Sequence, residues 1–93
     1  MKFYSLNNQA QKVSFKEAVI AGIAPDKGLY FPEKIEPLPT SFYENIEELS
    51  NQEIAFNAIY QFVGDEIAND ALRAILADVL DFQFPVVQLE ENI

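Results

Sequence analysis

Apolar side chains recur every three or four positions over four stretches of the chain, and this spacing predicts four helices. The predicted helices cover residues 15–21, 42–49, 51–63 and 69–81. Gly22 and Gly64 follow the first and the third of them, at positions where glycine commonly ends a helix. Asn69 begins the fourth, and its side chain could cap the free N–H groups of the first turn.

Three Ser-x-x-Glu sequences support these helix starts. In such a capping box the serine hydroxyl accepts a hydrogen bond from the first turn, and the glutamate carboxylate accepts one from the N–H of the serine. The three pairs are Ser14 with Glu17, Ser41 with Glu44, and Ser50 with Glu53. Each pair opens an apolar-periodic run, so we expect each serine to cap a helix.

Short β-prone segments lie before, between and after the helices. They are residues 2–6, 11–13, 29–31 and 85–89. A turn over residues 25–28 precedes the third segment, because Pro25 fixes φ and Gly28 relaxes the exit. The expected fold is a small, helix-rich α+β domain with about four helices and three or four short strands. The last strand stops abruptly before Ile93, which favours a chain that continues in a longer protein.

The composition excludes several classes of function. The chain has 93 residues, enough for one domain, and 15 acidic against 6 basic residues give a net charge of -9. This charge argues against binding to nucleic acid or to an anionic membrane surface, and no apolar run is long enough to span a bilayer. The lack of His and Cys removes zinc sites, Ser-His and Cys-His catalysis and disulfides. We expect a cytoplasmic location.

Carboxylates, hydroxyls and a few lysines remain as candidates for chemistry. Adjacent acids, which we expect on the solvated surface, occur at Glu47-Glu48, Asp65-Glu66 and Glu90-Glu91. Lys16 has an aromatic and an acidic neighbour, as a Schiff-base lysine could, but its place in a first helical turn predicts that it points to water. The aromatic residues are expected in the core. We therefore assign no catalytic, cofactor-binding or metal-binding residue.

Residues 13–32 closely resemble the N-terminal signature of the threonine synthase family. The family pattern is an S-F-x-E-A helix, a G-L-A turn and then D-G-G-L-Y-x-P, and this chain reads S-F-K-E-A, G-I-A and D-K-G-L-Y-F-P. Three further segments are similar to the family: Phe3-Tyr4-Ser5, G-D-E-I at residues 64–67, and Phe84-Pro85-Val86. The departures are Ile23 for Leu, and Lys27 for the first Gly of the pair, which puts a positive φ at that position in question.

The resemblance implies a function for the parent protein. Threonine synthases are pyridoxal-phosphate enzymes, carbon–oxygen lyases acting on phosphates, that convert O-phospho-L-homoserine and water to L-threonine and phosphate in threonine biosynthesis. Their cofactor lysine lies in a later His-Gly-Pro-Thr…Phe-Lys-Asp motif. Residues 1–93 would therefore be the N-terminal domain of such an enzyme, without its catalytic domains and inactive alone.

The same resemblance implies the partners. The domain would pack against the catalytic domains of its own polypeptide and could take part in an oligomer contact. Pyridoxal phosphate would bind to the parent enzyme, and this segment would bind no cofactor. The open alternative is a free-standing acidic interaction module that binds a basic partner without catalysis.

Overall fold

The computed structural model describes residues 1–92. Its helices are α1 (Phe15–Ala21), α2 (Thr40–Glu44), α3 (Asn51–Val63) and α4 (Asn69–Val79), with a short 3₁₀ helix η1 (Ile46–Glu48) between α2 and α3. The strands β1 (Phe3–Ser5) and β2 (Tyr30–Pro32) pair antiparallel, with Phe3 opposite Pro32. The predicted α+β class is confirmed.

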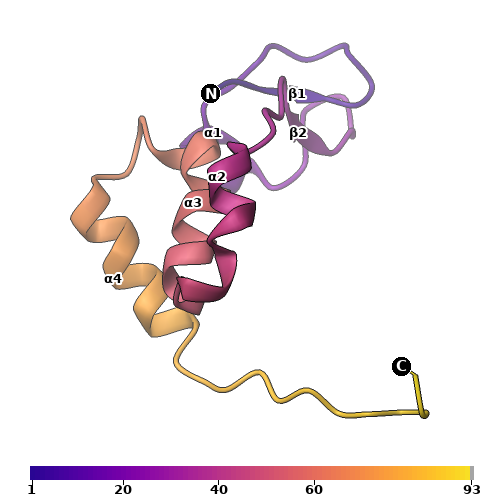
Figure 1. Cartoon of the computed structure of the whole chain (residues 1–93). Coiled ribbons are helices and arrows are strands. Elements are labelled where there is room, and N and C mark those ends of the chain that lie inside the picture. The colour runs from indigo at the N-terminus through magenta and orange to yellow at the C-terminus, as the bar shows by residue number, and fades with distance from the viewer. Residues whose placement is uncertain (93) are drawn as a thin grey trace.

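The elements form two groups, and Figure 1 shows the sheet at one end of the body and α4 at the other. The sheet and α1 make up one group, while α2, α3 and α4 make up the other. The core lies where α4 packs on α3, around the buried side chains of Val63, Leu72 and Leu76. Phe15 of α1 reaches this core from the first group. Beyond α4 the chain leaves the body as an extended tail (Figure 1).

Two helices have the predicted bounds because local capping signals define their ends. Ser14 and Glu17 form both halves of a capping box at the start of α1, and Gly22 ends that helix with φ +73°. At the start of α3 the side chain of Ser50 accepts a hydrogen bond from the N–H of Glu53. Each serine satisfies an N–H that has no partner within its helix.

The second predicted helix is broken in the structure. Residues 42–49 divide into the end of α2 and the separate helix η1, with Asn45 between them. The side-chain amide of Asn45 donates to the carbonyl of Ser41 at 2.9 Å, a local bond that competes with continuation of the helix. The predicted cap at Ser41 is also wrong, because α2 begins at Thr40 and Pro39 occupies the cap position.

The fourth helix begins at Asn69, as predicted, but Asn69 is not its cap. Ala68 has extended backbone angles and occupies the cap position, so Asn69 is the first helical residue and no side chain caps α4. The helix ends at Val79, two residues before the predicted end. Such one- or two-residue differences at helix ends are common.

The sheet has two strands where three or four were predicted. Val13 forms only an isolated bridge with Phe3, so residues 11–13 are not a strand. Residues 85–89 are not a strand either, and Val86 is 99% exposed. A β-prone sequence becomes a strand only when another strand offers its backbone N–H and C=O groups, and within residues 1–92 none lies beside this tail.

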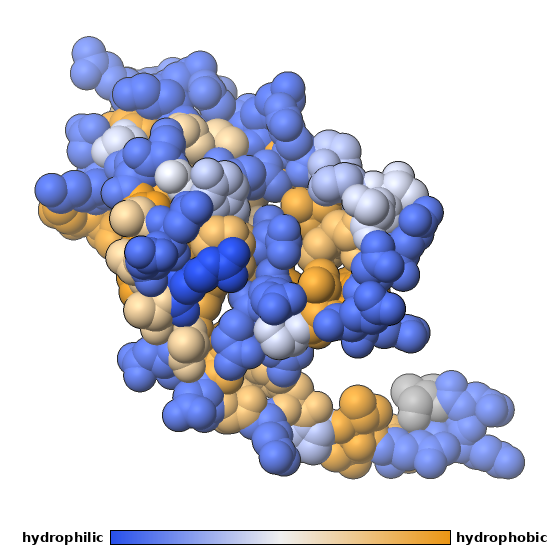
Figure 2. Space-filling view, turned by 60° about the vertical axis from the view of Figure 1, so that its left-hand side comes forward, coloured by the Kyte–Doolittle hydropathy of each residue, from blue (hydrophilic) through white to orange (hydrophobic). Residues whose placement is uncertain are grey.

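Apolar side chains remain on the surface of both groups. Figure 2 shows them on the face it displays and along the tail. The exposed large apolar residues include Val19, Ile20, Ile23, Leu29, Phe31, Ile35, Val79, Phe82, Val86 and Leu89. Within the described part of the chain, no helix is long and apolar enough to cross a membrane.

Candidate functional site

The turn before β2 is built around a buried hydroxyl. The Ser5 side chain is fully buried, and its Oγ donates to Oδ1 of Asp26 at 2.5 Å. The backbone N–H groups of Gly28 and Gln9 donate to the same carboxylate, each at 3.0 Å. The hydroxyl of Ser5, helped by these two N–H groups, lowers the pKa of Asp26. These contacts explain why Asp26 stands in the turn.

Two backbone positions of this turn have special requirements. A Cβ on Gly28 would lie 2.0 Å from Oγ of Ser5, so no larger residue fits there. Lys27 has φ +69°, a positive φ that a non-glycine residue rarely adopts. The positive φ that the sequence analysis put in question at this position is therefore present.

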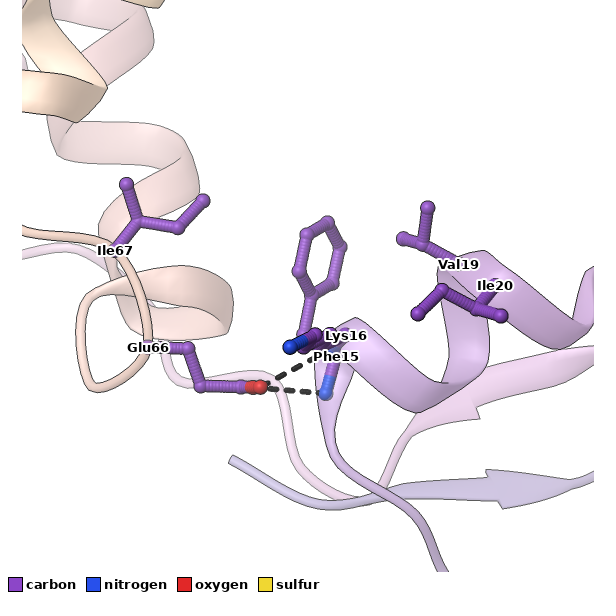
Figure 3. A pocket seen from close by; sticks show the side chains of 6 residues that line it. All are labelled: Phe15, Lys16, Val19, Ile20, Glu66 and Ile67. Carbon is purple, nitrogen blue, oxygen red and sulfur yellow. Dashed lines mark hydrogen bonds between the residues drawn. The ribbon is translucent and has the colours of Figure 1, made fainter.

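Glu66 joins the α3–α4 connection to the first turn of α1. Its carboxylate accepts hydrogen bonds from the N–H of Phe15 at 2.8 Å and from the N–H of Lys16 at 3.1 Å (Figure 3). Oγ of Ser14 accepts the next N–H, that of Glu17, at 3.1 Å. The N–H of Ser14 donates to Oε1 of Glu17 at 3.3 Å, so all four free N–H groups at the start of α1 are satisfied. Glu66 of the G-D-E-I sequence thus supplies one of the contacts that hold the two groups of elements together.

Two further contacts support this arrangement, one between the groups and one between α3 and the segment that joins β2 to α2. The N-terminal ammonium of Met1 donates to Oδ2 of Asp65 at 2.6 Å, and this hydrogen bond lowers the pKa of Asp65. Gln61 of α3 makes a two-way amide contact with the backbone of Glu36, at 2.9 and 3.0 Å. Asp65 and Glu66 were predicted to be ordinary solvated acids, so their structural part was missed. The G-D-E-I resemblance was the signal that could have found it.

Beside the Glu66 contact lies an open apolar hollow of about 440 Å³. Its walls come from α1 and from the α3–α4 connection (Figure 3): Phe15, Lys16, Val19, Ile20, Glu66 and Ile67. A second apolar hollow, of about 270 Å³, lies between the sheet and α3 and is also lined by Phe15. The ring of Phe15 therefore forms a wall of both hollows.

Lys16 lies at the rim of the first hollow and is exposed, as predicted. Its surroundings do not fit pyridoxal phosphate. A phosphate group would need free N–H donors, but in the first turn of α1 these already bind the Glu66 carboxylate, which would also repel the phosphate. Among residues 1–92 no three acidic side chains gather closely enough to hold a metal ion.

The predicted placement of the aromatic residues in the core holds only in part. Phe56 and Phe62 pack against the core, and Arg73 of α4 stacks 3.9 Å from the ring centre of Phe56. Phe31 and Tyr43 are exposed instead. In a domain whose core is formed by two helices, there is not enough interior for all the aromatic rings.

These features define a class of protein, a small acidic α+β domain. The motifs that resemble the family form its turns and helix contacts, and an apolar hollow lies open on its surface. Residues 2–79 match the family described as "Threonine synthase N terminus", and the chain belongs to this family.

Individual relatives agree with this family. The chain is 27% identical to the threonine synthase of Escherichia coli over 93 residues, which are all of this chain and 22% of the relative. It is 30% identical to that of Methylobacillus glycogenes, covering 98% of this chain and 20% of the relative. It is 32% identical to the threonine synthase of Schizosaccharomyces pombe, covering 82% of this chain and 15% of the relative. The chain thus spans about a fifth of the relatives' length. No solved structure matches it.

Proposed function

We propose that the chain is the non-catalytic N-terminal part of a pyridoxal-phosphate-dependent threonine synthase. The observation that carries the proposal is the match of the whole chain to about a fifth of the Escherichia coli enzyme, within a family defined by that enzyme's N terminus. In this proposal the parent enzyme is a lyase of threonine biosynthesis in the cytoplasm. It converts O-phospho-L-homoserine and water to L-threonine and phosphate.

The proposal assigns the cofactor to the remaining polypeptide. Support comes from the first turn of α1, where the carboxylate of Glu66 occupies the N–H groups that a cofactor phosphate would need. Further support comes from Ser5 and Asp26, whose polar groups bond to each other and to the turn rather than facing an open pocket. The polar residues of the shared motifs thus build the fold of this domain.

The domain's part in the enzyme is to pack on the catalytic domains of the same polypeptide. Its accessible surface is 7343 Å², whereas a compact monomer of this mass exposes about 5,400 Å². Its radius of gyration is 16.7 Å, against about 12 Å for a compact domain of this length. The excess includes the tail, and it exceeds the roughly 800 Å² that one partner buries in a standard interface. A chain with so much uncovered apolar surface is suited to a covering partner.

The test uses the parent polypeptide expressed to its native stop codon. The proposal predicts the visible absorption of bound pyridoxal phosphate and release of phosphate from O-phospho-L-homoserine. A polypeptide that binds no cofactor and releases no phosphate would contradict it. The acidic interaction module would then be the better account, and the net charge of -9 makes its own prediction. Binding to a basic partner would weaken strongly as salt is added.

A further inference from the structure

The outward face of α1 carries an unusual amount of uncovered apolar surface. Val19 is 62% exposed and Ile20 is 76% exposed, and Ile23 continues the same face just beyond the helix. Of the seven residues of α1, only Ala18 is buried. A single exposed aliphatic side chain is ordinary, but a group of them beside a hollow marks an interaction site.

The hollow next to this face is shaped for an apolar side chain. Phe15, Val19 and Ile20 of α1 line it together with Ile67 of the α3–α4 connection (Figure 3). The carboxylate of Glu66 at its edge is already engaged by the N–H groups of α1. A side chain that enters the hollow would therefore meet mainly carbon atoms along its walls and leave no buried acid without a partner.

The rim of the hollow carries charged groups. Lys16 lines it and forms no ion pair among residues 1–92, whereas Lys12 and Lys34 pair with Glu33 and Glu36. In a chain of net charge -9 this leaves a cation beside an apolar recess. The rim thus carries charges of both signs, because Glu66 lines the hollow as well, and the matching occupant is an apolar side chain.

We propose that this hollow and the exposed face of α1 are the docking site for the remaining polypeptide of the parent enzyme. The inference rests on the proposed function, since the relatives have about four-fifths of their length outside the matched segment. Residues 80–92, if fully extended at about 3.3 Å per residue, span roughly 43 Å, close to the longest dimension of the chain, 48 Å. A domain attached to this tail can therefore reach α1, at an effective concentration in the millimolar range.

Covalent labelling of aliphatic side chains in the full-length protein tests the proposal. Ile20 should be modified several-fold more slowly than Ile35, which is 67% exposed and lies away from the hollow. The variant Ile20→Asp should raise the labelling of Val19 and Ile23 several-fold by releasing the contact. The matched control Ile35→Asp, with the same added charge, should leave that labelling and the enzyme activity unchanged.

The outcomes separate docking from the proposed function. Labelling of Ile20 as fast as that of Ile35, in a protein that releases phosphate from O-phospho-L-homoserine, would overturn the docking site alone. Protection of Ile20 that disappears on dilution would assign the hollow to a second copy and would also overturn the proposal. Protection that is independent of concentration and is lost in Ile20→Asp would support it. An inactive full-length protein would overturn the proposed function whatever the labelling shows.

Discussion

The contact between Glu66 and α1 gives the most specific prediction about the fold. The substitution Glu66→Ala removes both hydrogen bonds to the N–H groups of Phe15 and Lys16. Loss of a helix cap costs about 0.5 to 2 kcal/mol, and loss of a carboxylate near a helix N-terminus costs about 0.3 to 1 kcal/mol. Because Glu66 is exposed, we expect the lower part of the combined range, about 1 to 1.5 kcal/mol.

Hydrogen exchange of α1 measures this loss directly. A free-energy loss of about 1.4 kcal/mol increases local opening about tenfold, so the amides of α1 should exchange about tenfold faster in Glu66→Ala. The control is Glu47→Ala, since the carboxylate of Glu47 makes no hydrogen bond among residues 1–92. Equal exchange of α1 in the two variants would refute the conclusion that Glu66 holds α1 to the α3–α4 connection.

Three further predictions concern single contacts. Gly28→Ala should lower the free energy of unfolding by about 2 kcal/mol or more in urea titrations, because its Cβ would overlap Oγ of Ser5. Gly22→Ala should lower the free energy of unfolding by about 1 kcal/mol, because the added Cβ contacts no atom but the residue must keep φ +73°. An equal loss of unfolding free energy in Gly28→Ala and Gly22→Ala would contradict the steric argument. The pKa of Asp26 is lowered in the folded chain, so its stabilisation is present above the unfolded value of 3.8 and is lost as the pH falls through the folded value. Acid titration of Asp26→Asn should therefore show a shallower loss of stability below pH 3.8 than the unchanged chain, and identical slopes would count against this role. Arg73→Ala should destabilise the packing of α4 on α3 by about 0.5 to 1 kcal/mol in thermal unfolding, and no change would mean that the cation–π contact contributes nothing.

The parts of the fold that the sequence predicted are those fixed by local signals. Ser14, Ser50 and Gly22 set helix ends through contacts within four residues, and α1 and α3 have the predicted bounds. Asn45 shows the limit of prediction from apolar spacing. Its side-chain amide donates a hydrogen bond to the carbonyl of Ser41, and the helix that the spacing predicts is divided at this residue. Residues 85–89 show a second limit of prediction from local sequence. A strand forms only beside another strand, and the sequence of a segment does not specify its neighbour.

The candidate site could be predicted only through resemblance. Glu66 and the first turn of α1 lie about fifty residues apart in the chain, and no local pattern connects them. Asp26 and Ser5 are likewise joined across 21 positions by a single hydrogen bond. Each of these residues lies in a segment that resembles the family, but only the geometry showed that its role is structural.

The central claim is that this chain is the N-terminal part of a longer threonine synthase. The most direct test is to read the gene beyond the codon for Ile93. The account predicts an open reading frame that continues for about four times the length of this chain, as in the relatives, and encodes a cofactor lysine in a His-Gly-Pro-Thr…Phe-Lys-Asp motif. A stop codon directly after Ile93, or a continuation without that lysine, would contradict the account.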